Sequence, residues 1–85
     1  MKKKKRKNGF WNHRVMAHIY EGEVYFKIHE VHYKKKNIPY LYSKNTETIE
    51  GDSVKSLKWT LKKMKDCLKK PILYYGERFP EEYLE

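Results

Sequence analysis

The fold of this 85-residue chain is decided by the stretch GDSVKSLKWTLKKMKDCLKKP, residues 51–71. Its first residues, Gly51-Asp52-Ser53, carry N-cap chemistry, and Lys70-Pro71 is a helix stop. The apolar residues between them recur at spacings of three and four. They are Val54, Leu57, Leu61, Met64 and Leu68. The stretch therefore predicts an amphipathic helix of about 17 residues whose apolar stripe packs against a sheet.

The residues before this helix predict a long β-hairpin. From Trp11 to Tyr20 the odd-numbered apolar positions alternate with mostly polar neighbours, and Glu23 to Tyr33 is rich in β-forming side chains. Glu21-Gly22 makes the turn between them, because glycine supplies the positive φ of a tight hairpin. The apolar parity of the second strand shifts along its length. A bulge near His29-Glu30 is expected to reconcile its two halves.

Two shorter segments complete the expected sheet. Ile38 to Tyr42 reads as a third strand, placed at an edge because Pro39 has no N–H for a ladder. Ile72 to Tyr75 either adds one more edge strand or packs over the helix end. The expected fold class is α+β, with a three- to four-stranded antiparallel sheet packed on one C-terminal amphipathic helix.

The domain organisation follows from these elements. Residues 10–75 form a single ββ(β)α domain. Residues 1–9 are expected to be a basic disordered arm, because they repel one another and contain nothing to bury. Residues 76–85 mix acidic and aromatic side chains and read as a docking tail for a partner groove.

Length and cysteine content restrict the class of protein. So short a chain forms one domain with a small core, which oligomerisation or a partner usually supports. Cys67 is the only cysteine, so an intramolecular disulfide and a secreted disulfide scaffold are excluded. No apolar run reaches the length of a membrane span, and no signal-peptide pattern is present. We expect a soluble cytoplasmic protein, and a homodimer in which the second copy covers an aromatic-rich sheet face.

The charge of the chain points to nucleic acid. The formal net charge is +9, from 20 Lys and Arg against 11 Asp and Glu. Such a field attracts polyanions and speeds encounter with them, so nucleic acid is the expected partner, with DNA favoured. The predicted contacts are Lys2, Lys3, Lys4, Lys5, Arg6, Lys7, Lys55, Lys58, Lys62, Lys65 and Lys69.

The helix lysines form a second stripe of their own, at the same spacings of three and four residues. This lysine face consists of Lys55, Lys58, Lys62, Lys65 and Lys69. One interpretation is an ordinary solvated face. Such a face usually carries glutamates four residues from its lysines, whereas here only Asp66 interrupts the cations. The other interpretation is a surface that follows the phosphates of nucleic acid.

Aromatic side chains predict a protein interface. Trp59 points away from the apolar stripe, and three explanations stay open: it stacks on a base, anchors a protein interface, or is covered by the chain's own ends. The chain also holds eight tyrosines, which suit surfaces that pack and hydrogen-bond at once. The predicted interface residues are Trp59, Tyr40, Tyr42, Tyr74, Tyr75, Phe79, Tyr83 and Leu84.

No pattern indicates catalysis, a metal or a cofactor. The sequence has no glycine-rich phosphate loop, no serine in a nucleophile elbow and no cysteine paired with a motif histidine. His13 and His18 fall on opposite faces of their strand, as do His29 and His32, so a metal site is not expected. We therefore expect a non-enzymatic binding protein.

Four motifs resemble those of a family of small uncharacterised bacterial and phage proteins. The match covers residues 11–73 and supports the fold more than any activity. The basic arm, the lysine-rich helix and the C-terminal tail depart from the family's usual pattern. The motifs are Trp11-Asn12-His13-Arg14-Val15, Ile28-His29-Glu30-Val31-His32-Tyr33, Gly51-Asp52-Ser53 with Leu57, and Lys70-Pro71-Ile72-Leu73.

The outline of a short, basic, oligomer-prone chain is also similar to accessory proteins and inhibitors of CRISPR effectors. This similarity implies a homodimeric accessory protein in antiviral defence. It would bind a nucleic-acid-handling effector, such as an RNA-guided nuclease, and add cationic surface that promotes DNA engagement. Two alternatives stay open: an inhibitor of such a nuclease, and an autonomous DNA- or RNA-binding protein without a protein partner.

Overall fold

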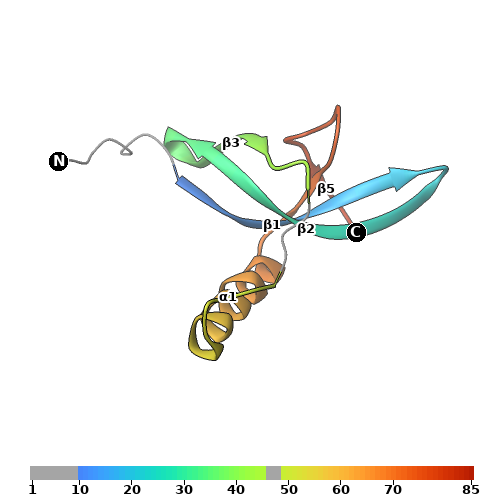
Figure 1. Cartoon of the computed structure of the whole chain (residues 1–85). Helices are drawn as coiled ribbons and strands as arrows, with labels where there is room; N and C mark the ends of the chain where they lie inside the picture. Colours follow the sequence, from blue (N-terminus) through green and yellow to red (C-terminus); the bar gives the residue numbers. More distant parts are fainter. Residues whose placement is uncertain (1–9, 46–48) are drawn as a thin grey trace.

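The computed structural model describes residues 10–45 and 49–85 (Figure 1). It confirms an α+β chain with one C-terminal helix. The predicted basic arm, with Lys2 to Lys7, lies outside the described residues. The elements are β1 (Phe10–Tyr20), β2 (Glu23–Lys34), the 3-10 turn η2 (Lys35–Asn37), β3 (Ile38–Tyr42), α1 (Val54–Asp66), the 3-10 turn η3 (Cys67–Lys69), β4 (Ile72–Tyr74) and β5 (Glu82–Tyr83).

The sheet has five strands in the order β3-β2-β1-β4-β5. The edge position predicted for β3 from Pro39 is confirmed. The expectation of a wholly antiparallel sheet is wrong, because β4 pairs parallel to β1 through Met16↔Leu73 and Ala17↔Tyr74. β4 is also not an edge strand, since β5 pairs along its other side. A parallel pair requires a long crossover connection, and the segment that contains α1 supplies it.

The β1–β2 hairpin is continuous and forms the longest part of the sheet. Its pairs run unbroken from Phe10↔Tyr33 to Tyr20↔Glu23, so the predicted bulge near His29-Glu30 is wrong. The register shift lies instead between His32 and Tyr33, where β2 pairs with β3. Glu21 and Gly22 have φ values of 52° and 81° at the turn, as a two-residue hairpin turn requires.

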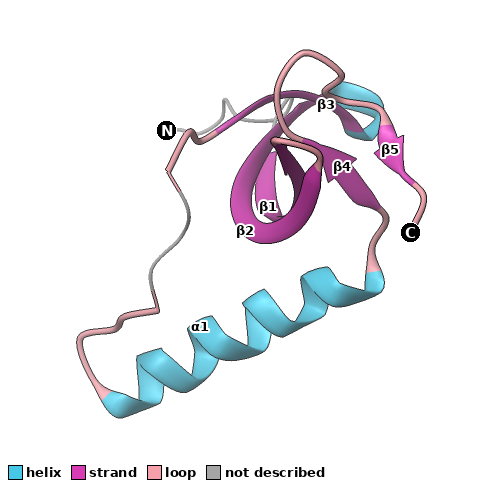
Figure 2. Cartoon of the chain, turned by 90° about the vertical axis from the view of Figure 1, so that its right-hand side faces the viewer, coloured by secondary structure: helices cyan, strands magenta, loops and turns pink. Residues whose placement is uncertain are grey.

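The main core lies on the side of the curled sheet opposite α1. The segment between β4 and β5 closes this side together with β3 (Figures 1 and 2). Met16, Val31, Tyr33 and Leu73 are buried there, and the partly buried side chains that pack on them are Tyr42, Tyr75 and Phe79. The odd-numbered residues of β1 therefore do not form the core alone, because the even-numbered Met16 belongs to it. Val15 and Ala17 are buried as well, because β1 is the central strand.

Residues 76–85 continue the domain beyond the boundary expected at residue 75. Phe79 packs against the core through Tyr42, with ring centroids 4.7 Å apart. Glu82 and Tyr83 then form β5 and pair with Leu73 and Ile72 of β4. Part of the expected docking tail is therefore used to build the sheet.

The helix begins where the sequence predicts. The Ser53 hydroxyl accepts from the Ser56 N–H, and the Ser56 hydroxyl accepts from the Ser53 N–H, both at 3.1 Å. These reciprocal bonds form a capping box. The regular α-helix has 13 residues instead of about 17, because its last turn tightens into η3 before Pro71.

The packing predicted for the apolar stripe is mostly wrong. Met64 is buried and Leu57 is half-buried, as a sheet-facing stripe requires. The other three side chains are exposed at 73%, 44% and 67%; they are Val54, Leu61 and Leu68. Side chains from the strands and the C-terminal segment already fill the inside of the sheet. The helix lies outside it and is fixed chiefly near its C-terminal end, where Met64 and Cys67 are buried.

Candidate functional site

The lysine face of α1 and η3 is fully displayed to solvent. All five of its side chains, Lys55, Lys58, Lys62, Lys65 and Lys69, are exposed. Within residues 10–45 and 49–85, none of the five forms an ion pair with a carboxylate; the ion pairs there join Arg78 to Glu81 and His32 to Glu30. The face extends over about 20 Å of helix axis. It is an uncompensated row of positive charge.

A groove lies beside this face, between the start of β1 and the helix. It measures about 550 Å³ and contains both tryptophans of the chain, Trp11 and Trp59. Trp59 is 61% exposed, so the C-terminal segment does not cover it. The Lys63 ammonium lies 5.3 Å from the Trp59 ring centroid. Exposed indoles next to cations are typical of surfaces that stack on bases or anchor a protein partner.

The predicted interface residues divide between the surface and the fold. Trp59, Tyr40 and Leu84 are exposed, at 61%, 47% and 87%. The other five are half-buried. Of these, Tyr42, Tyr75 and Phe79 pack on the core, while Tyr74 and Tyr83 meet edge to face with ring centroids 5.4 Å apart. Their use as docking residues stays a prediction.

The hairpin end presents apolar side chains that the sequence analysis did not select. β4 pairs with β1 only at Met16 and Ala17, and β3 pairs with β2 only from Val31 onward. The hairpin therefore projects beyond its neighbouring strands, away from the helix (Figure 1). The sequence signal for this projection was the length of the two hairpin strands, which exceeds that of β3 and β4. The exposed side chains there are Ile19, Tyr20, Val24, Tyr25 and Phe26.

Two histidines meet in the sheet across neighbouring strands. The Nε2 atoms of His18 and His29 lie 2.9 Å apart, and His29 Nδ1 lies 2.8 Å from the Ser43 carbonyl oxygen. His29 is fully buried. The His18 ring stacks on Tyr75, with centroids 4.0 Å apart, and on Tyr25 at 5.1 Å. Strand periodicity relates histidines only to others on the same strand, so the sequence did not reveal this pair.

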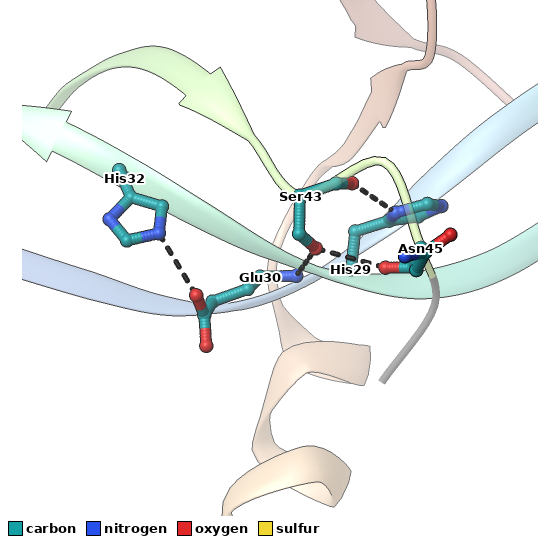
Figure 3. A network of polar contacts seen from close by, with 5 residues as sticks. All are labelled: His29, Glu30, His32, Ser43 and Asn45. Atoms are coloured by element: carbon teal, nitrogen blue, oxygen red, sulfur yellow. Dashed lines mark hydrogen bonds and ion pairs between the residues drawn. The ribbon is translucent and has the colours of Figure 1, made fainter. Parts of the chain in front are cut away.

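Ser43 and its neighbours fix the loop after β3 beside this pair (Figure 3). The Ser43 hydroxyl accepts from the Glu30 N–H at 3.3 Å and donates to the Asn45 carbonyl at 3.0 Å. The Ser43 N–H donates to the Glu30 carbonyl at 2.9 Å. On the other side of β2, His32 Nε2 lies 3.0 Å from Glu30 Oε1. Several hydrogen bonds therefore fix the position of the Ser43 carbonyl group that contacts His29.

The hydrogen bonds determine which ring nitrogens carry protons. The Ser43 carbonyl can only accept, so His29 Nδ1 carries a hydrogen. When His29 is neutral, it accepts at Nε2 and His18 donates to it from its own Nε2. Burial, followed by the proximity of His29 and Lys27, lowers the pKa of His18 below its ordinary 6.5. The lowered pKa favours the neutral form of His18, and in the tautomer that donates from Nε2 its Nδ1 is an acceptor.

Other groups that could carry chemistry are sparse in residues 10–45 and 49–85. Burial raises the pKa of the Cys67 thiol, so it is a poor nucleophile. In this part of the chain, no three His, Cys, Asp or Glu side chains gather closely enough to hold a metal ion. No helix there is long and apolar enough to cross a membrane.

Comparison with known protein families, curated proteins and solved structures finds no match to this chain. The resemblance of residues 11–73 to small bacterial and phage proteins therefore stays a prediction.

Proposed function

We propose that this chain is a non-enzymatic accessory protein that binds nucleic acid through its lysine face. The observation that supports the proposal best is the exposed row of Lys55, Lys58, Lys62, Lys65 and Lys69 without carboxylate partners among the described residues. Lysines four apart repel one another, and glutamates at that spacing would relieve the repulsion. A polyanion relieves it as well, and gains free energy from released counterions.

The proposed contact combines charge with stacking. The tryptophan groove adjoins the lysine face, and its lining also contains two lysines and two carboxylates, Lys63, Lys70, Glu50 and Asp66. A strand lying along the lysines would bring its unpaired bases within reach of Trp11 and Trp59. Because the chain has no other tryptophan, its intrinsic fluorescence reports on this groove directly.

The lysine face is tested by charge reversal. Lys58→Glu with Lys62→Glu is expected to weaken oligonucleotide binding at least about tenfold at 0.1 M salt. It should also reduce the slope of log affinity against log salt by about two, since two phosphate contacts are lost. Tryptophan fluorescence titrations from 0.05 to 0.3 M salt measure both quantities. Both side chains are exposed, so the melting temperature should hardly change.

The matched control is Lys34→Glu with Lys35→Glu, which changes the net charge equally at exposed positions of β2 and η2, outside the helix. This pair should alter the salt slope far less. Equal losses for both pairs would mean that the chain attracts nucleic acid only through its net charge. An unchanged slope for the helix pair would show that its lysines are merely solvated.

A protein partner is the second part of the proposal, supported by the exposed apolar stripe of Val54, Leu61 and Leu68. Exposed apolar patches on so small a domain usually mark an interface. We propose a second copy of the chain and a larger nucleic-acid-handling protein, such as an RNA-guided nuclease, as its partners. Exposed charges are strongly screened at about 0.5 M salt. Co-purification of such a nuclease at that salt concentration distinguishes this role from that of an autonomous DNA- or RNA-binding protein without a protein partner. Faster or slower cleavage by the complex then separates an activator from an inhibitor.

The proposed homodimer is tested by measuring the mass of the protein in solution. Light scattering at tens of micromolar is expected to give twice the chain mass of 10.5 kDa. Leu61→Asp with Leu68→Asp should return the mass to that of one chain without unfolding it, because both side chains are exposed. The lysine-face variant should remain dimeric. A parent protein with the mass of a single chain would refute the dimer.

A further inference from the structure

A second, polar pocket opens beside the histidine pair, and the lysine face contributes nothing to it. It measures about 390 Å³. Its lining contains two lysines, two histidines, an asparagine and two tyrosines, and no carboxylate among the described residues. The lining residues are His18, Tyr25, Lys27, His29, Lys44, Asn45 and Tyr75. The pocket therefore has the charge of an anion site.

We propose that this pocket binds a phosphate group and that His18 takes up a proton as the phosphate binds. The inference goes beyond the proposed function and does not rest on it. Lys27 and Lys44 lie on β2 and on the loop after β3, so the pocket offers the phosphate two ammonium groups from different segments. Ammonium groups bind phosphate as compact point charges.

The histidine pair supplies the directed part of the site. His29 is held by the Ser43 carbonyl at 2.8 Å and is fully buried, so its ring orientation is fixed. His29 in turn holds His18 through the 2.9 Å contact between their Nε2 atoms. Tyr25 and Tyr75 stack on the His18 ring. His18 is therefore a preoriented group at the pocket wall, with one nitrogen engaged and Nδ1 available.

Protonation makes His18 a donor at both nitrogens. In the neutral tautomer that donates to His29 from Nε2, Nδ1 is an acceptor and repels the oxygens of an anion. The imidazolium ring donates from Nδ1 to a phosphate oxygen while Nε2 still donates to His29. The groups around His18 are Tyr25, Lys27 and His29 of β2, with Lys44 and Tyr75. None of these described groups is a carboxylate, and an anion entering the pocket would place negative charge beside the imidazolium ring.

The surroundings of His18 favour its neutral form. Burial, His29 and Lys27 all disfavour its charged form and lower its pKa. A bound dianion reverses the electrostatic part of this effect. By linkage, the phosphate must raise the His18 pKa, and acid must tighten the binding of an anion whose own charge stays constant.

The test uses the full chain labelled at its histidine rings, titrated with inorganic phosphate and followed by NMR. Phosphate is expected to raise the pKa of His18. Sulfate, whose charge does not change between pH 5.5 and pH 8, should bind at least about tenfold more tightly at pH 5.5. A His18 pKa that phosphate leaves unchanged would overturn the proposal.

Two variants test whether the lysines of the pocket bind the phosphate. Lys27→Gln with Lys44→Gln should keep the fold, because both lysines are exposed, and should weaken phosphate binding about tenfold or more. Lys34→Gln, an exposed lysine of the same strand outside the pocket lining, is the matched control and should bind as the parent does. Equal binding by all three proteins would also overturn the proposal. Lys58→Glu with Lys62→Glu should leave the phosphate response intact, so failure of the lysine face and failure of this pocket are distinguishable.

The phosphate has two possible sources, a free phosphate compound or the end of a nucleic-acid strand. A short oligonucleotide with a 5′-phosphate, its 5′-hydroxyl counterpart and a mononucleotide are compared as competitors of inorganic phosphate. Stronger competition by the 5′-phosphorylated strand identifies a strand end, and stronger competition by the mononucleotide identifies a small ligand. If none of them competes, the pocket is not a phosphate site.

Discussion

Replacing Arg14 with leucine is expected to lower the free energy of unfolding by about 3 kcal/mol. Arg14 is only 7% exposed. Its Nε and Nη2 atoms donate to the Pro71 carbonyl at 3.2 and 2.6 Å, and Nη1 donates to the Tyr33 hydroxyl at 2.6 Å. Leucine would leave both acceptors without their donors in a buried region. Urea denaturation of the parent and the variant measures the difference.

Tyr33→Phe is the control for this prediction, because it removes the hydroxyl but keeps the ring that stacks on Phe10 at 4.6 Å. It should cost about 1 kcal/mol, the usual net value of one hydrogen bond. Arg14→Lys should recover little of the loss, since an ammonium group cannot bond the carbonyl twice and reach the hydroxyl as well. A cost for Arg14→Leu no larger than that of Tyr33→Phe would show that the contacts to Pro71 contribute nothing.

Arg14 also explains how the helix is joined to the sheet. Pro71 lies between η3 and β4, so Arg14 fixes the chain at the point where it leaves the helix and returns to pair with β1. The lysine face therefore keeps a defined position relative to the tryptophan groove. Nothing in the Trp11-Asn12-His13-Arg14-Val15 motif indicates that Arg14 reaches across the sequence to Pro71.

The elements that the sequence predicted well are those with local causes. The helix start depends on Ser53 and the N–H three residues on. The hairpin turn depends on the positive φ of Gly22, and the edge position of β3 depends on the missing N–H of Pro39. Each of these causes lies within a few residues of its effect, so it is visible in the sequence.

The features that the sequence did not predict depend on tertiary placement. The parallel pairing of β4 requires knowing where the chain returns after the helix. The contact between His18 and His29 requires the register of two strands and the curl of the sheet. For the helix, the spacing of Val54, Leu61 and Leu68 identified an apolar face but not what covers it. The inside of the sheet was already occupied by Tyr42, Tyr75 and Phe79.

The attachment of the helix leads to the last prediction. Met64→Ala is expected to lower the free energy of unfolding by about 3 kcal/mol, because this side chain is 5% exposed and its truncation leaves a cavity. Leu68→Ala lies one turn further on the same stripe but is 67% exposed, so it should cost about 0.5 kcal/mol or less. Urea denaturation measures both, at a protein concentration low enough for light scattering to give the mass of a single chain.

The two truncations also separate stability from binding. Met64→Ala loosens the helix from the sheet, so the lysines and the tryptophan groove no longer hold a fixed relation and oligonucleotide affinity should fall with stability. Leu68→Ala should leave affinity unchanged at the same concentration, because neither the lysine face nor the groove includes this residue. Equal stability losses for the two variants would mean that the whole apolar stripe packs on the sheet. That result would mean that the helix packs against the sheet along its length, as the spacing of its apolar residues predicts.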